Sequence, residues 1–205
     1  VEEMDLPLNI LSEEAGLVDR GQTRTLVIDP IDGTHNSMLG IPLYSVSLAV
    51  GTSSLSDVEV GVVRDLVSDD LFVAERDKGA ELNGRPIRVR EANPSLPATL
   101  VYLGRHAGSE TMKVVKRAGR VRSMGCASLE MCMVAQGKFD AYYMNCDIHE
   151  KSIRVVDIAA SALVLREAGG ELVDLQGRRL DMPFVLTARS NFLAFGDPRV
   201  REVLL

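Results

Sequence analysis

The chain has 205 residues, of which 46% are hydrophobic and 25% charged, as is typical of a globular protein with a sizeable core. No apolar run reaches the roughly 18 residues of a membrane span, and residues 1–10 lack the basic and apolar regions of a secretory signal. The net charge of −6 argues against a general nucleic-acid binder, and three cysteines without CxxC spacing favour reduced thiols. We therefore expect a cytoplasmic protein with neither membrane nor nucleic-acid partners.

Strands dominate the first part of the chain. A strand buried on both faces is predicted over residues 25–29, and alternating polar and apolar side chains predict half-buried strands over residues 44–51 and 58–66. Residues 69–89 are expected to form short strands joined by tight turns, because their Asn-Gly pair at 83–84 is a strong hairpin signal.

A linker-like stretch with two prolines, residues 93–98, separates the strand-rich part from a part in which strands alternate with helices. Helices that end at glycine are predicted over 109–119, 126–137 and 157–170, and strands over 99–104, 139–144, 170–175 and 184–188. This change divides the chain into an N-terminal part, residues 1–94, and a C-terminal part, residues 95–205. The expected class is a layered α+β or α/β fold.

Two aspartates, Asp29 and Asp32, end the first predicted strand in the sequence LVIDPIDGTHNS. Carboxylates forced together repel unless a cation lies between them, and a hard ion such as Mg²⁺ takes oxygen ligands, to which the Ile31 carbonyl could add. If the following GTHNS opens a helical turn, its free N–H groups suit a phosphate. Together these features suggest metal-assisted phosphoryl chemistry. Alternatively, Asp-Pro and Asp-Gly are merely turn formers.

Two further acidic sites have ordinary structural explanations when taken singly. Glu13 and Glu14 follow an apolar pair in ILSEEAG, where a capping box or a solvated acidic turn is equally reasonable. Asp157 begins a predicted helix, where an acidic residue is favoured as a cap.

The joint pattern is more specific than its parts. The Glu-Glu turn is followed sixteen residues later by D-P-I-D-G-T-x-N and, far downstream, by D-I-A-A with E-A-G-G. KGAELNGRPIRV (78–89) and RSMGCASLEMCMVAQGKFDAYY (122–143) complete a motif set that resembles the inositol monophosphatase family of Mg²⁺-dependent, lithium-sensitive sugar-phosphate phosphatases. The resemblance covers nearly the whole chain. It implies an α-β-α-β-α sandwich in two halves that meet near residue 95, and a homodimer.

The resemblance also implies a metal site. Two or three Mg²⁺ ions are expected on Glu13, Asp29, the Ile31 carbonyl, Asp32 and Asp157. In the family's chemistry one ion activates a water molecule and another stabilises the leaving oxygen. Glu13 and Thr34 are expected to orient that water, and Asp32 completes the set of catalytic residues.

The substrate contacts implied by the resemblance are made mostly by backbone. Gly33 and Thr34, with His35 beside them, are expected to bind the phosphate, and Gly125 and Ala127 to face the ring hydroxyls of the substrate. Glycine suits such a position because the backbone can approach a ligand closely, although a strand-to-helix turn also favours it.

Four departures from the family pattern bear on function. The Glu-Glu turn lies so early that the usual N-terminal helical section, with its Thr–Asp pair, is absent, so we expect a fragment, a processed form or a loss. Val156 replaces a tryptophan, and R-V-V-D resembles the archaeal branch, whose members often accept both inositol 1-phosphate and fructose 1,6-bisphosphate. Met144 replaces an acidic residue that contacts inositol, and the segment 143–157 is long.

We therefore expect a Mg²⁺-dependent phosphomonoesterase acting on small phosphorylated polyols or sugars, with inositol 1-phosphate and fructose 1,6-bisphosphate as candidate substrates. One alternative is a 3′-phosphoadenosine 5′-phosphate phosphatase, for which the sequence shows no adenine pocket. Another is a regulatory protein that binds metal and phosphate without turnover.

Overall fold

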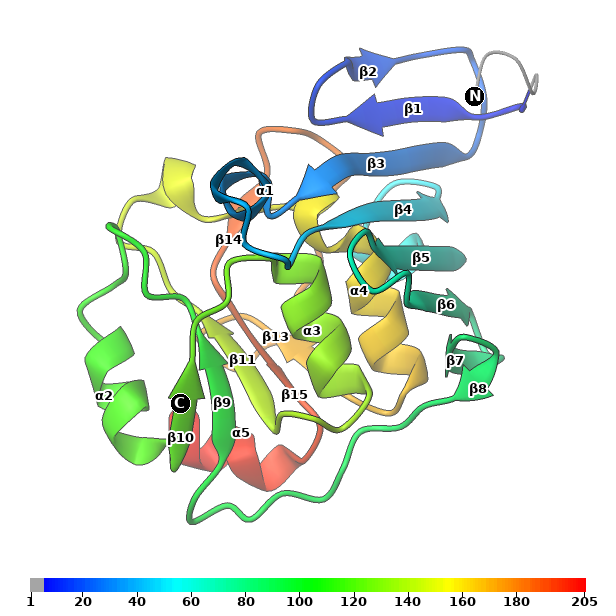
Figure 1. The fold of residues 1–205 in the computed structure, drawn as a ribbon. Helices are drawn as coiled ribbons and strands as arrows, with labels where there is room; N and C mark the ends of the chain where they lie inside the picture. The colour runs from blue at the N-terminus through cyan, green and yellow to red at the C-terminus, as the bar shows by residue number, and fades with distance from the viewer. Residues whose placement is uncertain (1–5) are drawn as a thin grey trace.

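A computed structural model of the chain describes residues 6–205, which form two large sheets with helices between them (Figure 1). The larger sheet has eight strands in the order β2-β1-β3-β4-β5-β6-β7-β8. Its neighbours pair antiparallel, except that β1 and β3 are parallel. The strands are β1 (Asn9–Ser12), β2 (Gly16–Val18), β3 (Thr25–Asp32), β4 (Ser45–Gly51), β5 (Val60–Asp65), β6 (Leu71–Glu75), β7 (Gly79–Leu82) and β8 (Arg85–Pro86).

The smaller sheet has five strands in the order β10-β9-β11-β15-β13. β9 is parallel to β10 and β11, whereas β15 is antiparallel to β11 and β13. A separate two-stranded ladder pairs β12 with β14 and sets Arg154 opposite Arg189. These strands are β9 (Ala98–Val101), β10 (Arg120–Arg122), β11 (Ala141–Met144), β12 (Ile153–Arg154), β13 (Glu171–Val173), β14 (Arg189–Ser190) and β15 (Phe192–Phe195).

Two central helices, α3 (Ala127–Ala135) and α4 (Val155–Glu167), lie between the sheets (Figure 1). Every residue of α4 from Val155 to Leu165 is buried, as expected for a helix that is apolar on all sides. Its close packing needs Gly61 in β5, because a Cβ there would lie 2.7 Å from the carbonyl oxygen of Ala160. The larger sheet therefore packs directly against the backbone of α4.

The remaining helices are short. α2 (Thr111–Arg117) and α5 (Pro198–Leu204) pack on the smaller sheet away from α3 and α4, α1 (Thr34–Leu39) follows β3, and the 3-10 turns are η1 (Leu55–Asp57) and η2 (His149–Lys151). No helix within residues 6–205 is long and apolar enough to cross a membrane.

The mixed α/β fold is confirmed, with layers in the order sheet, helices, sheet, helices. Within residues 6–205 no helix covers the outer face of the larger sheet. Apolar side chains on this face, such as those of Leu48, Val60 and Val62, are half-buried or exposed. The larger sheet comes from residues 9–86 and the smaller from 98–195. The domain division near residue 95 stays a prediction.

Most predicted elements are confirmed, and one strand is wrong. Asn83 and Gly84 have φ of 52° and 74°, which is the pair of positive values that a type I′ hairpin turn requires. The strand predicted over residues 184–188 is instead a bend and turn, and the strand that follows β13 in the smaller sheet is β15. All four β15 residues are buried between β11 and β13, so pairing on both edges selects that apolar run.

Candidate active site

A cavity of about 500 Å³ opens where β3 and the start of α4 meet. Its lining includes all ten residues singled out by the sequence: Glu13, Asp29, Ile31, Asp32, Gly33, Thr34, His35, Gly125, Ala127 and Asp157. They come from segments that are far apart in the chain, and the fold brings them together. Their individual roles stay predictions.

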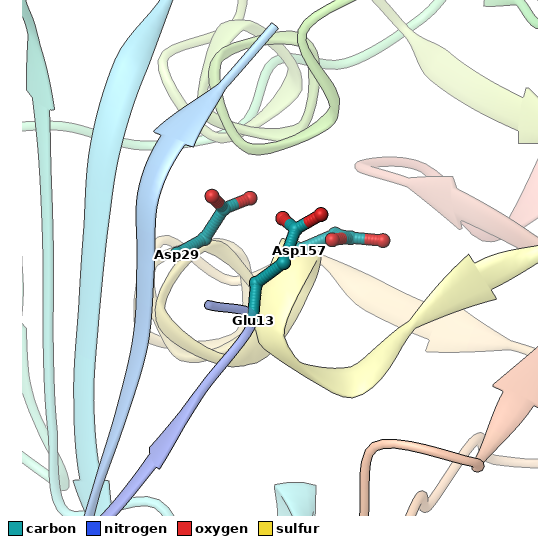
Figure 2. Close-up of side chains that lie close together, drawn as sticks. All are labelled: Glu13, Asp29 and Asp157. Atoms are coloured by element: carbon teal, nitrogen blue, oxygen red, sulfur yellow. The ribbon is translucent and has the colours of Figure 1, made fainter. Parts of the chain in front are cut away.

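Three carboxylates form the centre of this cavity. Glu13, Asp29 and Asp157, here called the acidic triad, each offer an oxygen atom within 4.8 Å of the others (Figure 2). The parallel pairing of β1 with β3 sets Ser12 beside Ile28, so that Glu13 follows next to Asp29. Asp157 reaches the same point from the first turn of α4. Hard carboxylate oxygens converging from three segments suit a divalent cation such as Mg²⁺.

The electrostatics of Asp29 support a cation site. This side chain is 1% exposed, and its pKa is raised to about 8 by burial and then by the charges of Asp32, Asp157 and Glu13. Burial raises the pKa of Asp157 as well, against the lowering effect of Arg154. Without a cation, the Asp29 carboxyl group therefore stays mostly protonated at neutral pH. A bound cation would allow the carboxylates to ionise together.

Arg154 is a residue that sequence reasoning missed. Its guanidinium donates to Glu13 Oε1 at 2.5 Å and to Asp157 Oδ1 at 2.8 Å. Burial disfavours the charge of Arg154, but the two carboxylates outweigh this effect and raise its pKa. The backbone N–H of Arg154 also donates to Asp157, which completes a capping box. The motif R-V-V-D could have indicated this pair, because it places Arg154 three residues before Asp157 at a helix start.

Asp32 lies in the same cavity but is held differently. Ser128 donates both its N–H and its hydroxyl to Asp32 Oδ2 at 2.6 Å, and Cys126 Sγ lies 3.2 Å from the same oxygen. Burial raises the pKa of Asp32, and the bonds from Ser128 oppose the rise. Asp32 thus ties the end of β3 to the start of α3. Sequence reasoning missed Ser128, although the motif SMGCAS contains it.

The turn after Asp32 is a helix start, as predicted. Gly33 is the N-cap of α1 with φ of 84°, and a Cβ there would lie 3.0 Å from the Leu43 carbonyl oxygen. Both facts favour glycine. The Thr34 hydroxyl donates to the Ile31 carbonyl at 2.8 Å, so its oxygen remains an acceptor. The first N–H groups of a helix have no intrahelical acceptor, which leaves them available to a ligand.

The family model for the inositol monophosphatase family matches residues 7–199. The chain belongs to the inositol monophosphatase family. A fructose-1,6-bisphosphatase/inositol-1-monophosphatase of Thermococcus kodakarensis is 35% identical over 98% of this chain and 74% of its own length. A protein of the same name from Methanocaldococcus jannaschii is 34% identical over 98% of this chain and 76% of its own length.

A solved structure described as an inositol monophosphatase–fructose 1,6-bisphosphatase has the same fold. It matches with a TM-score of 0.85 and 33% identity, over 100% of this chain and 78% of that one. The family and these relatives show that the chain is a phosphatase, and hence a hydrolase. The family is generally metal-dependent. In this chain the acidic triad is a cluster of carboxylates that could bind a metal ion.

The cavity also has lining residues that were not predicted as part of the site. Lys151 and Arg189 line it together with Glu130 and Met144. Burial raises the pKa of Glu130 to about 7, against a hydrogen bond from the Met124 N–H. Met144 indeed lines the cavity at the position where an acidic residue was expected, and it offers no charge there. Lys151 lies in the long segment 143–157, whereas no sequence motif indicated Arg189 or Glu130.

Proposed function

We propose that this phosphatase hydrolyses phosphomonoesters of small polyols or sugars, with inositol 1-phosphate and fructose 1,6-bisphosphate as its candidate substrates. The observation that carries the proposal is that the acidic triad and the Gly33–His35 turn line one cavity. Carboxylates for a cation and free amides for a phosphate are the two requirements of metal-assisted phosphoryl transfer. We further propose a cytoplasmic homodimer that is inhibited by Li⁺ when Mg²⁺ is below saturation.

In this proposal Glu13, Asp29 and Asp157 hold Mg²⁺, and Asp32 with the Ile31 carbonyl provides further ligands for two or three ions in all. When bound, Mg²⁺ supplies an activated water molecule and stabilises charge on the leaving oxygen.

The chain's own groups orient the reactants. The Thr34 hydroxyl donates a hydrogen bond to the Ile31 carbonyl, so its oxygen can accept a hydrogen bond from the attacking water. The N–H groups that follow Gly33 bind the phosphate oxygens, which fixes the ester for in-line attack. Gly125 and Ala127 face the organic part of the substrate from the same cavity.

Two basic side chains of the cavity lining, those of Lys151 and Arg189, favour a substrate with a second phosphate. Arg189 donates to the carbonyl oxygens of Leu186 at 2.5 Å and Ala188 at 3.0 Å. These acceptors are neutral, so they position the guanidinium without cancelling its positive charge. Lys151 lines the same cavity. Two cations attract a second phosphate strongly, whereas Met144 offers no hydrogen bond to an inositol hydroxyl. We therefore expect fructose 1,6-bisphosphate to be the better substrate.

The test is phosphate release from inositol 1-phosphate, fructose 1,6-bisphosphate and 3′-phosphoadenosine 5′-phosphate, with Mg²⁺ and with a chelator. We expect Mg²⁺-dependent hydrolysis of the first two. Preference for the adenosine compound would refute the proposed substrate class. Hydrolysis of none, by a protein that still folds and binds Mg²⁺, would favour the regulatory alternative.

A further inference from the structure

A second cavity, of about 540 Å³, lies at the other end of α4. Arg166 and Glu167 at the end of the helix line it, whereas Asp157 near the start lines the candidate active site. Arg166 follows Asp157 by nine positions along α4, which corresponds to roughly 14 Å at about 1.5 Å per residue. The two cavities share no lining residue.

Four arginines from separate segments meet at this second cavity, here called the arginine cavity: Arg76, Arg166, Arg179 and Arg201. Burial lowers the pKa of Arg166, and the nearby charges of Arg179 and Arg76 lower it further, with only partial compensation from Asp181. Within residues 6–205 the side chains of Arg179 and Arg201 have no hydrogen-bond or ion-pair partner. The arginines therefore repel one another, and a bound anion would relieve that repulsion.

Neutral backbone groups hold the guanidinium groups of Arg166 and Arg76 in place. Arg166 donates to the carbonyl oxygens of Leu55 at 2.6 Å and Leu180 at 3.4 Å. Arg76 donates to those of Val58 at 2.7 Å and Ser56 at 3.1 Å. Carbonyl acceptors fix the orientation of a guanidinium without cancelling its charge. Each guanidinium has five N–H donors, so some remain for a ligand.

The rest of the lining is an apolar floor with acidic residues beside it. Leu163 and Leu172 are buried side chains on the floor. The carboxylate of Glu167 accepts the N–H groups of Asp77 at 3.0 Å and Gly79 at 2.9 Å, so it is committed to holding the β6–β7 turn. Glu171 and Asp77 are exposed residues of the lining, at the solvent side of the cavity.

We propose that the arginine cavity binds a small organic molecule that carries two or more phosphates. The phosphates pair with the guanidinium groups, since planar guanidinium and phosphate form parallel charged hydrogen bonds. The organic part packs on the apolar floor, and the exposed carboxylates accept hydrogen bonds from its hydroxyl or amino groups. This ligand site is separate from the catalytic cavity and does not depend on the substrate proposed above.

The test uses ATP as the probe, by calorimetry on the whole chain in the presence of a chelator. Substituting Arg179→Ser and Arg201→Ser together should weaken ATP binding at least about tenfold, because each charged hydrogen bond is worth that much or more. The matched control is Arg85→Ser with Arg88→Ser, which removes the same charge from two exposed arginines that line neither cavity. The control should bind ATP within about twofold of the original chain.

Three outcomes would overturn the proposal. The first is no saturable ATP binding by the unaltered chain, and the second is equal weakening in both double variants, which would indicate non-specific attraction. The third is tighter binding of inorganic triphosphate than of ATP, because the organic part would then contribute nothing. The Arg179→Ser, Arg201→Ser variant should keep its phosphatase activity and its unliganded melting temperature, since both side chains lack partners within residues 6–205.

Discussion

Binding of Mg²⁺ to the acidic triad should release a proton from Asp29 at neutral pH. The pKa of Asp29 is about 8 in the protein alone, against an ordinary value of 3.8. At about pH 7 the carboxyl group is then roughly 90% protonated, and it must ionise to become a ligand. The apparent affinity for Mg²⁺ should therefore fall about tenfold from pH 7 to pH 6. Burial also raises the pKa values of Asp32 and Asp157, so one proton is a lower bound.

The same shift predicts how stability without metal depends on pH. Between 3.8 and about 8 the folded chain keeps the Asp29 proton and the unfolded chain has lost it, so the folded state binds more protons. Stability from this group is complete below the lower value and is lost as pH rises toward the upper one. From pH 5 to pH 7 the loss is at most roughly 3 kcal/mol, at about 1.4 kcal/mol per pH unit.

Calorimetric titration with Mg²⁺ in two buffers of different ionisation enthalpy measures the released proton directly. Asp29→Asn is the matched variant, because it keeps the volume of the side chain but has no proton to release. It should bind Mg²⁺ more weakly and lose the proton release that belongs to position 29. Heats that do not depend on the buffer, or an affinity that stays constant between about pH 6 and pH 8, would refute the reasoning.

Three substitutions test the rest of the site. Asp32→Asn should lower phosphate release at least about 100-fold and leave the circular dichroism spectrum unchanged, because it removes charge but not volume; activity within a few-fold of the original would contradict its role. Arg154→Gln should destabilise the metal-free protein by about 1–3 kcal/mol and tighten Mg²⁺ binding, because the guanidinium no longer competes for Glu13 and Asp157; weaker Mg²⁺ binding in calorimetry would argue against that competition. Gly33→Ala should cost about 1–3 kcal/mol in chemical denaturation, because φ is 84° and a Cβ meets backbone; an unchanged midpoint would show that the turn relaxes.

Local rules were enough to predict much of this protein. The Asn83–Gly84 hairpin follows from two residues that accept positive φ, and the glycines that end the helices act within one turn. The motif around Asp29 and Gly33 likewise encodes a strand end and a helix start within a few residues. Each of these outcomes depends on neighbours in the chain, so the sequence alone carries the information.

The tertiary structure decided what depends on distant partners. Arg154 meets Glu13 across 141 residues, and Ser128 meets Asp32 across 96, and neither pairing has a local signal. β15 was chosen over residues 184–188 because its edges pair with β11 and β13, which is a property of the assembled sheet. The arginine cavity arises in the same way, from charges that only the packing of α4 between two sheets brings close. Local sequence sets backbone conformation, whereas charge balance and strand pairing depend on which segments meet in space.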